Sequence, residues 1–390
     1  MTASEVEFHA PNVWSFSALR DARECPRRWA LRASGRVQEA HAPGGGGAAP
    51  GMGLMRGRVC HAVLERMLDA HREHDGPAWG SPALQAFWKR HFSRGIVGLV
   101  REEADRELRR DISRRDPSFE ARLRREVDEA IPSLAASVSA LLRLTLSRAS
   151  ESERPIAFAE VPVESEMAPG VRWSGRIDAV VRGGGDVTLI DFKTGTPSPQ
   201  DLEQLTAYAC IFERDVRTRG LGRVRLLVVL YARGGVEEQD APTGDALDAE
   251  RTRFAREALD AARRLSASPP EASPAPERCP RCDVRGHCDA YWDARVMWED
   301  LPQKVAPTID AELSVTEVLG GGRALLARGD AGSWFVRLDP KHEKVARTLT
   351  SGSRVRLVAA SPVPRAGVDE GPSADLVVEV SGRGMLISRA

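Results

Sequence analysis

The spacing of apolar residues divides the chain into three regions. From about residue 56 to residue 146, apolar side chains recur every three or four positions, which predicts helices. In the middle of the chain, apolar and alternating runs predict strands separated by helices, and this order indicates an α/β domain with a helix-rich insertion. The predicted strands lie at about 156–163, 171–181, 186–192 and 223–231, and the predicted helices at 199–213 and 245–265.

The third region, beyond about residue 300, has short alternating runs separated by Gly, Asp and Pro. Three strands, a short helix and two further strands are predicted, which is the order of elements in a small β-barrel of the OB type. We therefore predict two domains, 1–298 and 304–390. The predicted strands lie at 312–318, 323–328, 333–338, 354–360 and 374–380, with the helical stretch HEKVARTL after the third.

The N-terminal region contributes a predicted helix and a predicted linker. Residues 15–33 have a helical pattern with Ser15 as a plausible N-cap. The Gly-rich stretch 42–53 has the composition of a flexible linker. The chain contains no Walker A pattern, GxxxxGK followed by Ser or Thr, so any ATP-driven motor would belong to a partner.

Composition adds limits on partners and location. The 390 residues include 56 basic and 56 acidic side chains, so contact with nucleic acid would depend on a local basic patch. No apolar run approaches the roughly 18 residues that a membrane span needs. The N-terminus has no basic segment followed by an apolar one, so no secretory signal is predicted. We expect a cytoplasmic protein with no membrane partner.

Lysine usage singles out one position. Nearly all basic residues are arginines, and Lys193 is the only lysine between residues 90 and 303. An ammonium is a compact charge that can lose its proton, whereas a guanidinium is always protonated. A lysine in this arginine-rich background indicates chemistry that arginine cannot perform.

Two acids and this lysine lie at the ends of two predicted strands. In the stretch LIDFKTG, Asp191 and Lys193 point to one face of the strand and Phe192 to the other. The preceding strand ends near Asp178, and the turn RGGGD makes the pair an antiparallel hairpin that can bring the two acids together. Adjacent carboxylates favour a cation between them, and oxygen ligands suit Mg²⁺ or Mn²⁺. For an isolated D-x-K, a solvated surface hairpin is the simpler interpretation.

Four short motifs together resemble the PD-(D/E)XK nuclease superfamily, and within it the RecB-like branch that carries an iron–sulfur cluster, as in AddB-like and CRISPR-associated RecB-like exonucleases. Each motif is weak alone, but their order is the one that the family requires, over about residues 13–295. The resemblance implies a restriction-endonuclease-like core. The motifs are GRVCHAVLERML (57–68), GRIDAV (175–180), LIDFKTG (189–195) and QLTAYA (204–209).

The resemblance also implies roles for individual residues. His61, Asp178 and Asp191 would ligate the metal together with the carbonyl of Phe192, and Lys193 would be the catalytic lysine. Without the other motifs, His61 would be read as a packed histidine. Three further residues would lie at the active site by the same resemblance: Gln204 and Tyr208, four apart on one helix face, and Glu160, an additional acid near the metal.

Four of the six cysteines form a second set. Cys279, Cys282 and Cys288 have the spacing C-x2-C-x5-C, and Cys25 lies near the N-terminus. In a cytosolic chain this spacing favours a metal site over disulfides. Zinc and an iron–sulfur cluster are both compatible with four thiolates, and His287 could replace one of them at zinc. The resemblance favours a 4Fe–4S cluster that ties the two ends of the domain together.

The other two cysteines stand apart from this set. Cys60 and Cys210 lie in apolar helical contexts and are predicted to be buried small hydrophobic residues.

The function that we predict is a metal-dependent DNA nuclease, and the resemblance adds an exonuclease on single-stranded ends in DNA repair, recombination or phage defence. The alternative is a catalytically silent DNA-binding or scaffolding subunit of a helicase–nuclease complex. A third possibility, compatible with the first, is an adaptor whose C-terminal domain recruits a helicase or another repair or defence protein.

The C-terminal barrel could bind single strands through an aromatic platform and a basic groove, or could simply cover part of the nuclease. Trp334 and Phe335 are adjacent, so only one of them could form the platform. The arginines that could supply the basic surface are Arg323, Arg328, Arg337, Arg354 and Arg356.

Overall fold

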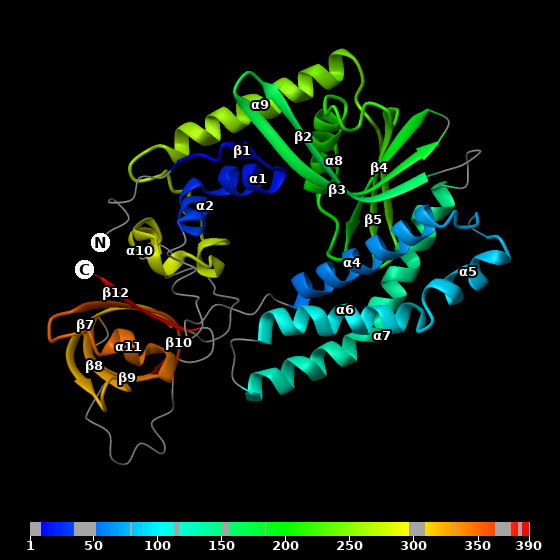
Figure 1. Cartoon of the computed structure of the whole chain (residues 1–390). Helices are drawn as coiled ribbons and strands as arrows, with labels where there is room; N and C mark the ends of the chain where they lie inside the picture. Colours follow the sequence, from blue (N-terminus) through cyan, green and yellow to red (C-terminus); the bar gives the residue numbers. More distant parts are fainter. Residues whose placement is uncertain are drawn as a thin grey trace. The chain divides into compact units, whose positions relative to one another are not determined.

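The structure is a computed structural model (Figure 1). Its contacts divide the chain into two compact units. The sheet unit comprises residues 11–19 and 49–260, and the cysteine–barrel unit comprises residues 1–10, 20–48 and 261–390. This grouping follows contacts alone, and the domain limits 1–298 and 304–390 remain predictions. The described residues are 9–34, 52–78, 80–112, 117–149, 156–183, 185–295, 309–330, 332–362, 376–380 and 384–389.

The sheet unit is built on a mixed six-stranded sheet. Its strand order is β1-β3-β4-β5-β6, and β2 pairs with the other edge of β3. The hairpin β2–β3–β4 is antiparallel, while β4 and β5 are parallel and are connected through the helix α8. The strands are β1 (Val13–Trp14), β2 (Ile156–Ala168), β3 (Val171–Gly183), β4 (Asp186–Lys193), β5 (Arg223–Tyr231) and β6 (Val236–Asp240).

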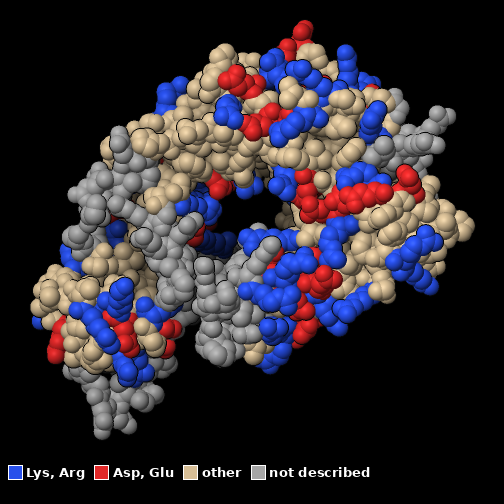
Figure 2. Space-filling view, in the orientation of Figure 1, with Lys and Arg blue, Asp and Glu red and all other residues tan. Residues whose placement is uncertain are grey.

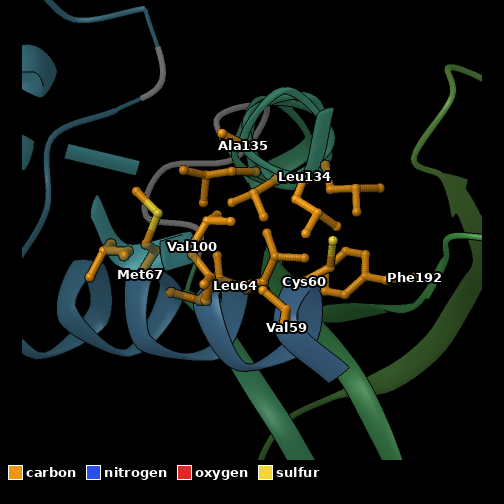
Figure 3. Packing of buried hydrophobic residues seen from close by; sticks show 14 of the residues in the cluster. Val59, Cys60, Leu64, Met67, Val100, Leu134, Ala135 and Phe192 are labelled. Carbon is orange, nitrogen blue, oxygen red and sulfur yellow. The ribbon is translucent and has the colours of Figure 1, made fainter. Parts of the chain in front are cut away.

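Helices from the predicted helical region cover one face of this sheet. Their apolar residues form one buried cluster with residues of β2 to β5, which explains the three- and four-residue spacing in the sequence. The helices are α4 (Met52–Glu73), α5 (Ala83–His91), α6 (Gly95–Ile112) and α7 (Pro117–Ala149). Figure 3 shows side chains of this cluster, among them Val59, Cys60, Leu64, Met67, Val100, Leu134, Ala135 and Phe192.

Within α7, the segment Arg124–Arg148 is long and apolar enough to cross a membrane by length and composition. Its buried residues, such as Leu134, Val138 and Leu141, belong to the same cluster, so packing against α4 and α6 accounts for the apolar stretch.

Helix α8 (Pro199–Phe212) covers the opposite face. Ser198 caps it in a capping box with Asp201, and Pro199 occupies the first turn. Helix α9 (Asp245–Leu265) matches the predicted range 245–265. The strands and helices predicted in this unit are therefore confirmed, with β2 and β3 longer than expected and with β1 and β6 additional.

One predicted helix is interrupted. Residues 15–33 form two helices, α1 (Phe16–Glu24) and α2 (Pro26–Ala33), separated by Cys25 in an extended conformation with φ −163° and ψ 104°. The prediction of a single helix was wrong, because a residue before proline is sterically disfavoured in the helical region. The break places Cys25 at the N-cap of α2. The predicted N-cap Ser15 is confirmed, since its Oγ accepts the backbone N–H of Ala18 at 3.1 Å.

In the cysteine–barrel unit, the described C-terminal residues contain a closed five-stranded β-barrel. The strands close in the order β7-β8-β9-β11-β10, and β10 returns to β7. The five predicted strands and the helix α11 (Glu343–Ala346) are confirmed, and β12 on the outer side of β10 is additional. The strands are β7 (Ile309–Leu319), β8 (Ala324–Gly329), β9 (Gly332–Leu338), β10 (Arg354–Pro362), β11 (Leu376–Val380) and β12 (Met385–Arg389).

The predicted linker 42–53 lies outside the described residues except for Met52 and Gly53, which begin α4.

Candidate functional site

Three carboxylates lie in a row across β2, β3 and β4. The antiparallel registers on both sides of Ala179, extended by one residue, place Glu160, Asp178 and Asp191 opposite one another on the three strands. The ladder between β3 and β4 ends at this point, and Asp178 Oδ2 accepts the backbone N–H of Phe192 at 2.6 Å. The predicted approach of Asp178 to Asp191 is therefore present, and Glu160 extends the row.

Helix α4 adds His61 to these carboxylates. Its Nδ1 lies 3.4 Å from Asp178 Oδ1 and 3.5 Å from Glu160 Oε1, and its Nε2 donates to the carbonyl of Phe192 at 3.1 Å. One atom from each of His61, Glu160 and Asp178 lies within 4.8 Å of the other two, which is close enough for a shared metal ion. The structure thus brings His61, Asp178 and the carbonyl of Phe192 together, with Glu160 in the same group, while Asp191 lies opposite Asp178 on β4.

The electrostatics of this cluster favour a bound cation. Burial by itself lowers the pKa of His61, but hydrogen bonds to Asp178 and Glu160 and their charges raise it to about 11. Burial, and then the neighbouring charge of Asp178, raise the pKa of Asp191 above its usual range. The carboxylates thus attract positive charge, and their oxygen atoms suit Mg²⁺ or Mn²⁺, to which His61 would bind in its neutral form.

Lys193 lies beside the same carboxylates. Its Nζ is 2.8 Å from Asp191 Oδ2 and donates to Gln204 Oε1 at 3.0 Å. Burial alone would lower the pKa of Lys193, but the charge and hydrogen bond of Asp191 raise it overall. The side chain is therefore a protonated ammonium that its neighbours hold in place, suited to stabilising charge on a phosphate or to donating a proton.

Gln204 connects Lys193 to Tyr208 on α8. Its Nε2 donates to Tyr208 Oη at 3.1 Å, so its amide orientation is fixed with the oxygen toward the ammonium. Burial raises the pKa of Tyr208 to about 12, which keeps the phenol neutral. The ring lies against the backbone at Gly175, where an added Cβ would be 2.4 Å from Tyr208 Cε1. Gly175 in the motif GRIDAV therefore makes room for the tyrosine.

Sequence reasoning missed Asp201. Its Oδ1 lies 3.8 Å from Lys193 Nζ, and its Oδ2 accepts the hydroxyl of Tyr231 at 3.0 Å. The signal was present in the sequence, because Ser198 and Asp201 have the spacing of a capping box at the start of the predicted helix 199–213. The box places a carboxylate near the C-terminal end of β4.

The second predicted set, the four cysteines, lines one small pocket. Cys25, Cys279, Cys282 and Cys288 contribute to its wall, together with Tyr291 and several neighbours, and His287 is not among the residues that line it. All six cysteines are free thiols, so the disulfide alternative is not observed. The remaining two cysteines, Cys60 and Cys210, are fully buried, as predicted.

Contacts between α2 and the segment 270–283 hold the cysteine pocket together. The guanidinium of Arg32 binds Asp283 through two hydrogen bonds of 2.8 and 3.0 Å. The backbone N–H of Arg27 donates to the carbonyl of Glu271 at 2.8 Å, and its Nε donates to the carbonyl of Pro270 at 2.6 Å. Cysteines far apart in the sequence are thereby brought to one place.

The structure of the barrel differs from the prediction that five arginines could supply a basic surface. Arg323, Arg328, Arg337 and Arg354 are exposed, but the side chain of Arg356 is only 4% exposed and pairs with acids. The prediction that Arg356 supplies a DNA-binding surface was wrong. Trp334 lies in the barrel core, which leaves the half-buried Phe335 as the remaining candidate for an aromatic platform.

Basic and acidic side chains are interspersed over the surface seen in Figure 2. This distribution agrees with the equal numbers of basic and acidic residues in the sequence.

Comparison with known proteins gives a family match. The family model described as the PD-(D/E)XK nuclease superfamily matches residues 13–289, more than half of the chain. The match includes every residue of the carboxylate cluster as well as all four pocket cysteines.

One curated relative is similar over part of its length. The Gene 69 protein of Mycobacterium phage L5 is 31% identical over 143 residues, which are 36% of this chain and 47% of the relative. The aligned segment thus spans about half of that protein.

Solved structures give weaker similarities. The crystal structure of SSO0001 has a TM-score of 0.26 at 14% identity, covering 59% of this chain and 96% of the other. A putative exonuclease from Eubacterium rectale has a TM-score of 0.27 at 12% identity, with 63% and 93% covered. A murine DNA binding protein bound to double-stranded DNA has a TM-score of 0.16 at 10% identity, with 60% and 93% covered. Similarities of this size support no statement about this chain.

Proposed function

Because the chain belongs to the PD-(D/E)XK nuclease superfamily, we propose that it is a metal-dependent DNA nuclease that hydrolyses phosphodiester bonds. The observation that carries this proposal is the convergence of His61, Glu160 and Asp178 on one point. Asp191 lies opposite Asp178 on β4, and Lys193 is held beside Asp191. A catalytically silent scaffold would have no need for a charged lysine that three polar groups hold in place.

The donor set fits a divalent cation. His61, Asp178, Asp191 and the carbonyl of Phe192 would hold it, and Glu160 is close enough to contribute a fifth ligand. When bound, such an ion would polarise the phosphate and lower the pKa of a coordinated water.

Residues of the chain would stabilise the transition state and position the catalytic lysine. Lys193 presents its ammonium next to the metal ligands, where it can neutralise charge that develops on the phosphate in the transition state. Asp191 and Gln204 hold the ammonium from two sides, and Tyr208 fixes the orientation of Gln204. Asp201 adds a second negative charge at 3.8 Å from the lysine. Together these contacts restrict the lysine to one position before substrate arrives.

We further propose the finer assignment to the RecB-like branch, with exonuclease action on single-stranded ends. Its support is the order of the four sequence motifs. A role in DNA repair, recombination or phage defence, a helicase or other ATPase partner, and a cytoplasmic location all remain predictions.

We also propose that the four pocket cysteines bind a 4Fe–4S cluster. The arrangement of one early cysteine and three later ones resembles that of the iron–sulfur RecB-like proteins, which favours a cluster over a single zinc ion. Four free thiols at one pocket also match the ligand number of such a cluster. Iron and acid-labile sulfide in the purified protein, in preference to zinc, would support this assignment.

For the barrel we propose the OB type. Support comes from the strand order, from the parallel pairing of its third and fifth strands, β9 and β11, and from the position of α11 between β9 and β10.

A cleavage assay tests the nuclease proposal. Protein purified without oxygen is incubated with end-labelled single- and double-stranded DNA in Mn²⁺, in Mg²⁺ or in EDTA. Wild type is expected to cut only with metal, and Lys193→Ala is expected to lower the rate by about 10²–10⁴-fold while DNA binding persists. Lys89→Ala, which changes the other lysine of the sheet unit at an exposed position on α5, is the matched control.

Each outcome separates the alternatives. The product ladder from a labelled end gives the mode and the polarity of cutting. Binding without cutting in every metal would favour a scaffolding subunit, and neither binding nor cutting would contradict the nuclease assignment of the isolated chain.

A further inference from the structure

A partly buried ion-pair network connects the barrel with residues 279–295, which we call the cysteine segment. Arg356 on β10 faces Glu312, its direct neighbour on β7, and donates to it at 2.8 Å. The same guanidinium donates to Asp289 at 2.7 Å and to the carbonyl of Gly286 at 3.3 Å, both just beside Cys288. It also lies 5.0 Å from the ring centroid of Trp292. One buried arginine thus connects two barrel strands to the segment that carries three pocket cysteines.

In a second network the arginine belongs to the cysteine segment and the acid belongs to the barrel. Arg285, between Cys282 and Cys288, donates to Asp310 of β7 at 2.7 Å and to the carbonyl of Cys282 at 3.2 Å. Asp310 also accepts the hydroxyl of Tyr291, a pocket-lining residue, at 2.8 Å. Each part therefore contributes one arginine to the contact: Arg285 of the cysteine segment pairs with the barrel, and Arg356 of the barrel pairs with the cysteine segment.

Apolar packing fills the space between the two networks. An added Cβ at Gly286 would lie 2.3 Å from Ile387 Cδ1 of β12, so the backbone of the cysteine segment touches the barrel directly. Tyr291, Trp292, Val358 and Met385 form a buried cluster against which Cys279 and Cys288 pack. Two of the four proposed ligands thus contact a core that belongs partly to the barrel.

The cysteine segment has little regular structure of its own. Two 3-10 turns, η2 (Cys279–Arg281) and η3 (Arg285–His287), precede the short helix α10 (Asp289–Arg295). Such short elements are unstable alone and take their conformation from what packs on them. The barrel supplies that surface on one side, and α2 supplies it on the other.

We propose that the C-terminal barrel is a structural wall of the cysteine metal centre, with Arg356 as a positioning residue, so that barrel docking and metal occupancy stabilise each other. This inference rests on the proposed metal centre. Coupling between two such states is reciprocal: whatever weakens docking weakens metal retention by the same free energy, and loss of metal loosens the barrel contact.

The first test compares metal retention in full-length protein. Wild type and Arg356→Met are purified without oxygen, their iron, sulfide and zinc are measured, and the loss of visible absorption is followed after addition of a chelator. Arg354→Met is the matched control, because Arg354 lies on the same strand but is exposed. Arg356→Met is expected to lose metal on the order of tenfold faster, which corresponds to about 1.4 kcal/mol in the barrier to metal loss.

The two possible failures are distinguishable. A wild-type protein that holds neither iron nor zinc after reconstitution would show that the metal centre itself is wrong, and the coupling with it. If wild type holds metal, and Arg356→Met and Arg354→Met lose it at equal rates, the proposed coupling is wrong while the metal centre itself is supported.

A second measurement avoids dependence on one variant that could fold poorly. Hydrogen exchange of wild type is compared before and after removal of the metal by chelator. Faster exchange is expected in β10 and β12, which contact the cysteine segment, with β8 and β9 unchanged. Unchanged exchange in all four strands, or faster exchange in all of them alike, would contradict the proposal.

Discussion

The ammonium of Lys193 lies 2.8 Å from the carboxylate of Asp191, two residues earlier on the same strand. The alternation of a strand puts both side chains on the α8 face, where Gln204 meets the lysine from the opposite side at 3.0 Å. The lysine is thus fixed both by its own strand and by the helix that follows it.

The hydrogen bond that Lys193 donates to Gln204 is expected to matter for the chemical step. Gln204→Ala removes a hydrogen bond to a charged group, and kcat for DNA cleavage should fall about 10- to 100-fold. Tyr208→Phe keeps the ring and removes only the hydroxyl that orients Gln204, so a smaller fall of about 2- to 10-fold is expected. Gln200→Ala, exposed on the same helix, is the control. Equal activity in all three variants would show that Lys193 needs no support from α8.

Gly175→Ala is expected to disturb the site through Tyr208. The new Cβ would lie 2.4 Å from Tyr208 Cε1, so the ring must move and the contact with Gln204 is strained. We expect a loss of about 1–3 kcal/mol in stability together with a lower kcat. Gly220→Ala is the comparison, because an added Cβ there meets nothing within 4 Å. Normal cleavage and melting in Gly175→Ala would contradict this account.

Divalent metal is expected to stabilise the sheet unit against unfolding. A ligand at about 100 times its Kd adds about 2.7 kcal/mol to the folded state, so Mn²⁺ should raise the melting temperature of wild type. Asp178→Asn removes a central ligand and should abolish most of that increase. Asp186→Asn, at the other end of the sheet and 61% exposed, should keep it. An increase of the same size in Asp178→Asn would place the metal elsewhere.

The barrel is expected to lose stability in acid because of His342. Burial, and then the charge of Lys341, lower the pKa of this histidine to about 4, while its Nε2 donates to the carbonyl of Gly384 at 3.2 Å. Since the folded pKa lies below the unfolded value of about 6.5, the neutral form is favoured in the fold. Its contribution is complete above about pH 6.5 and is lost as the pH falls toward 4, by at most about 3 kcal/mol.

Urea unfolding of the barrel transition at a series of pH values measures this contribution. His342→Gln retains a hydrogen-bond donor without a titrating ring, so its stability should fall less steeply over the same range. Parallel pH profiles for the two proteins would assign the acid sensitivity to other groups.

Local pattern was sufficient to predict most elements. The alternation in the barrel region and the three- and four-residue spacing in α4 to α7 reflect which side chains are buried, and burial within one element is encoded by neighbours in sequence. Strand alternation and a short hairpin turn likewise predict locally how Lys193, Asp178 and Asp191 are related, but their assignment as a site came from the resemblance of the four motifs.

Tertiary structure decided what depends on distant segments. No local pattern separates Arg356 from the exposed arginines of the barrel, yet it is buried because Asp289, 67 residues earlier, supplies a carboxylate at that point. Asp201 reaches Lys193 only because α8 folds back onto β4. Spacing grouped Cys279, Cys282 and Cys288, and the family resemblance added Cys25, while packing of α2 and the barrel determined where that set lies. The physical reason is that charge and burial at a site are sums over all neighbours, and most of these neighbours are distant along the chain.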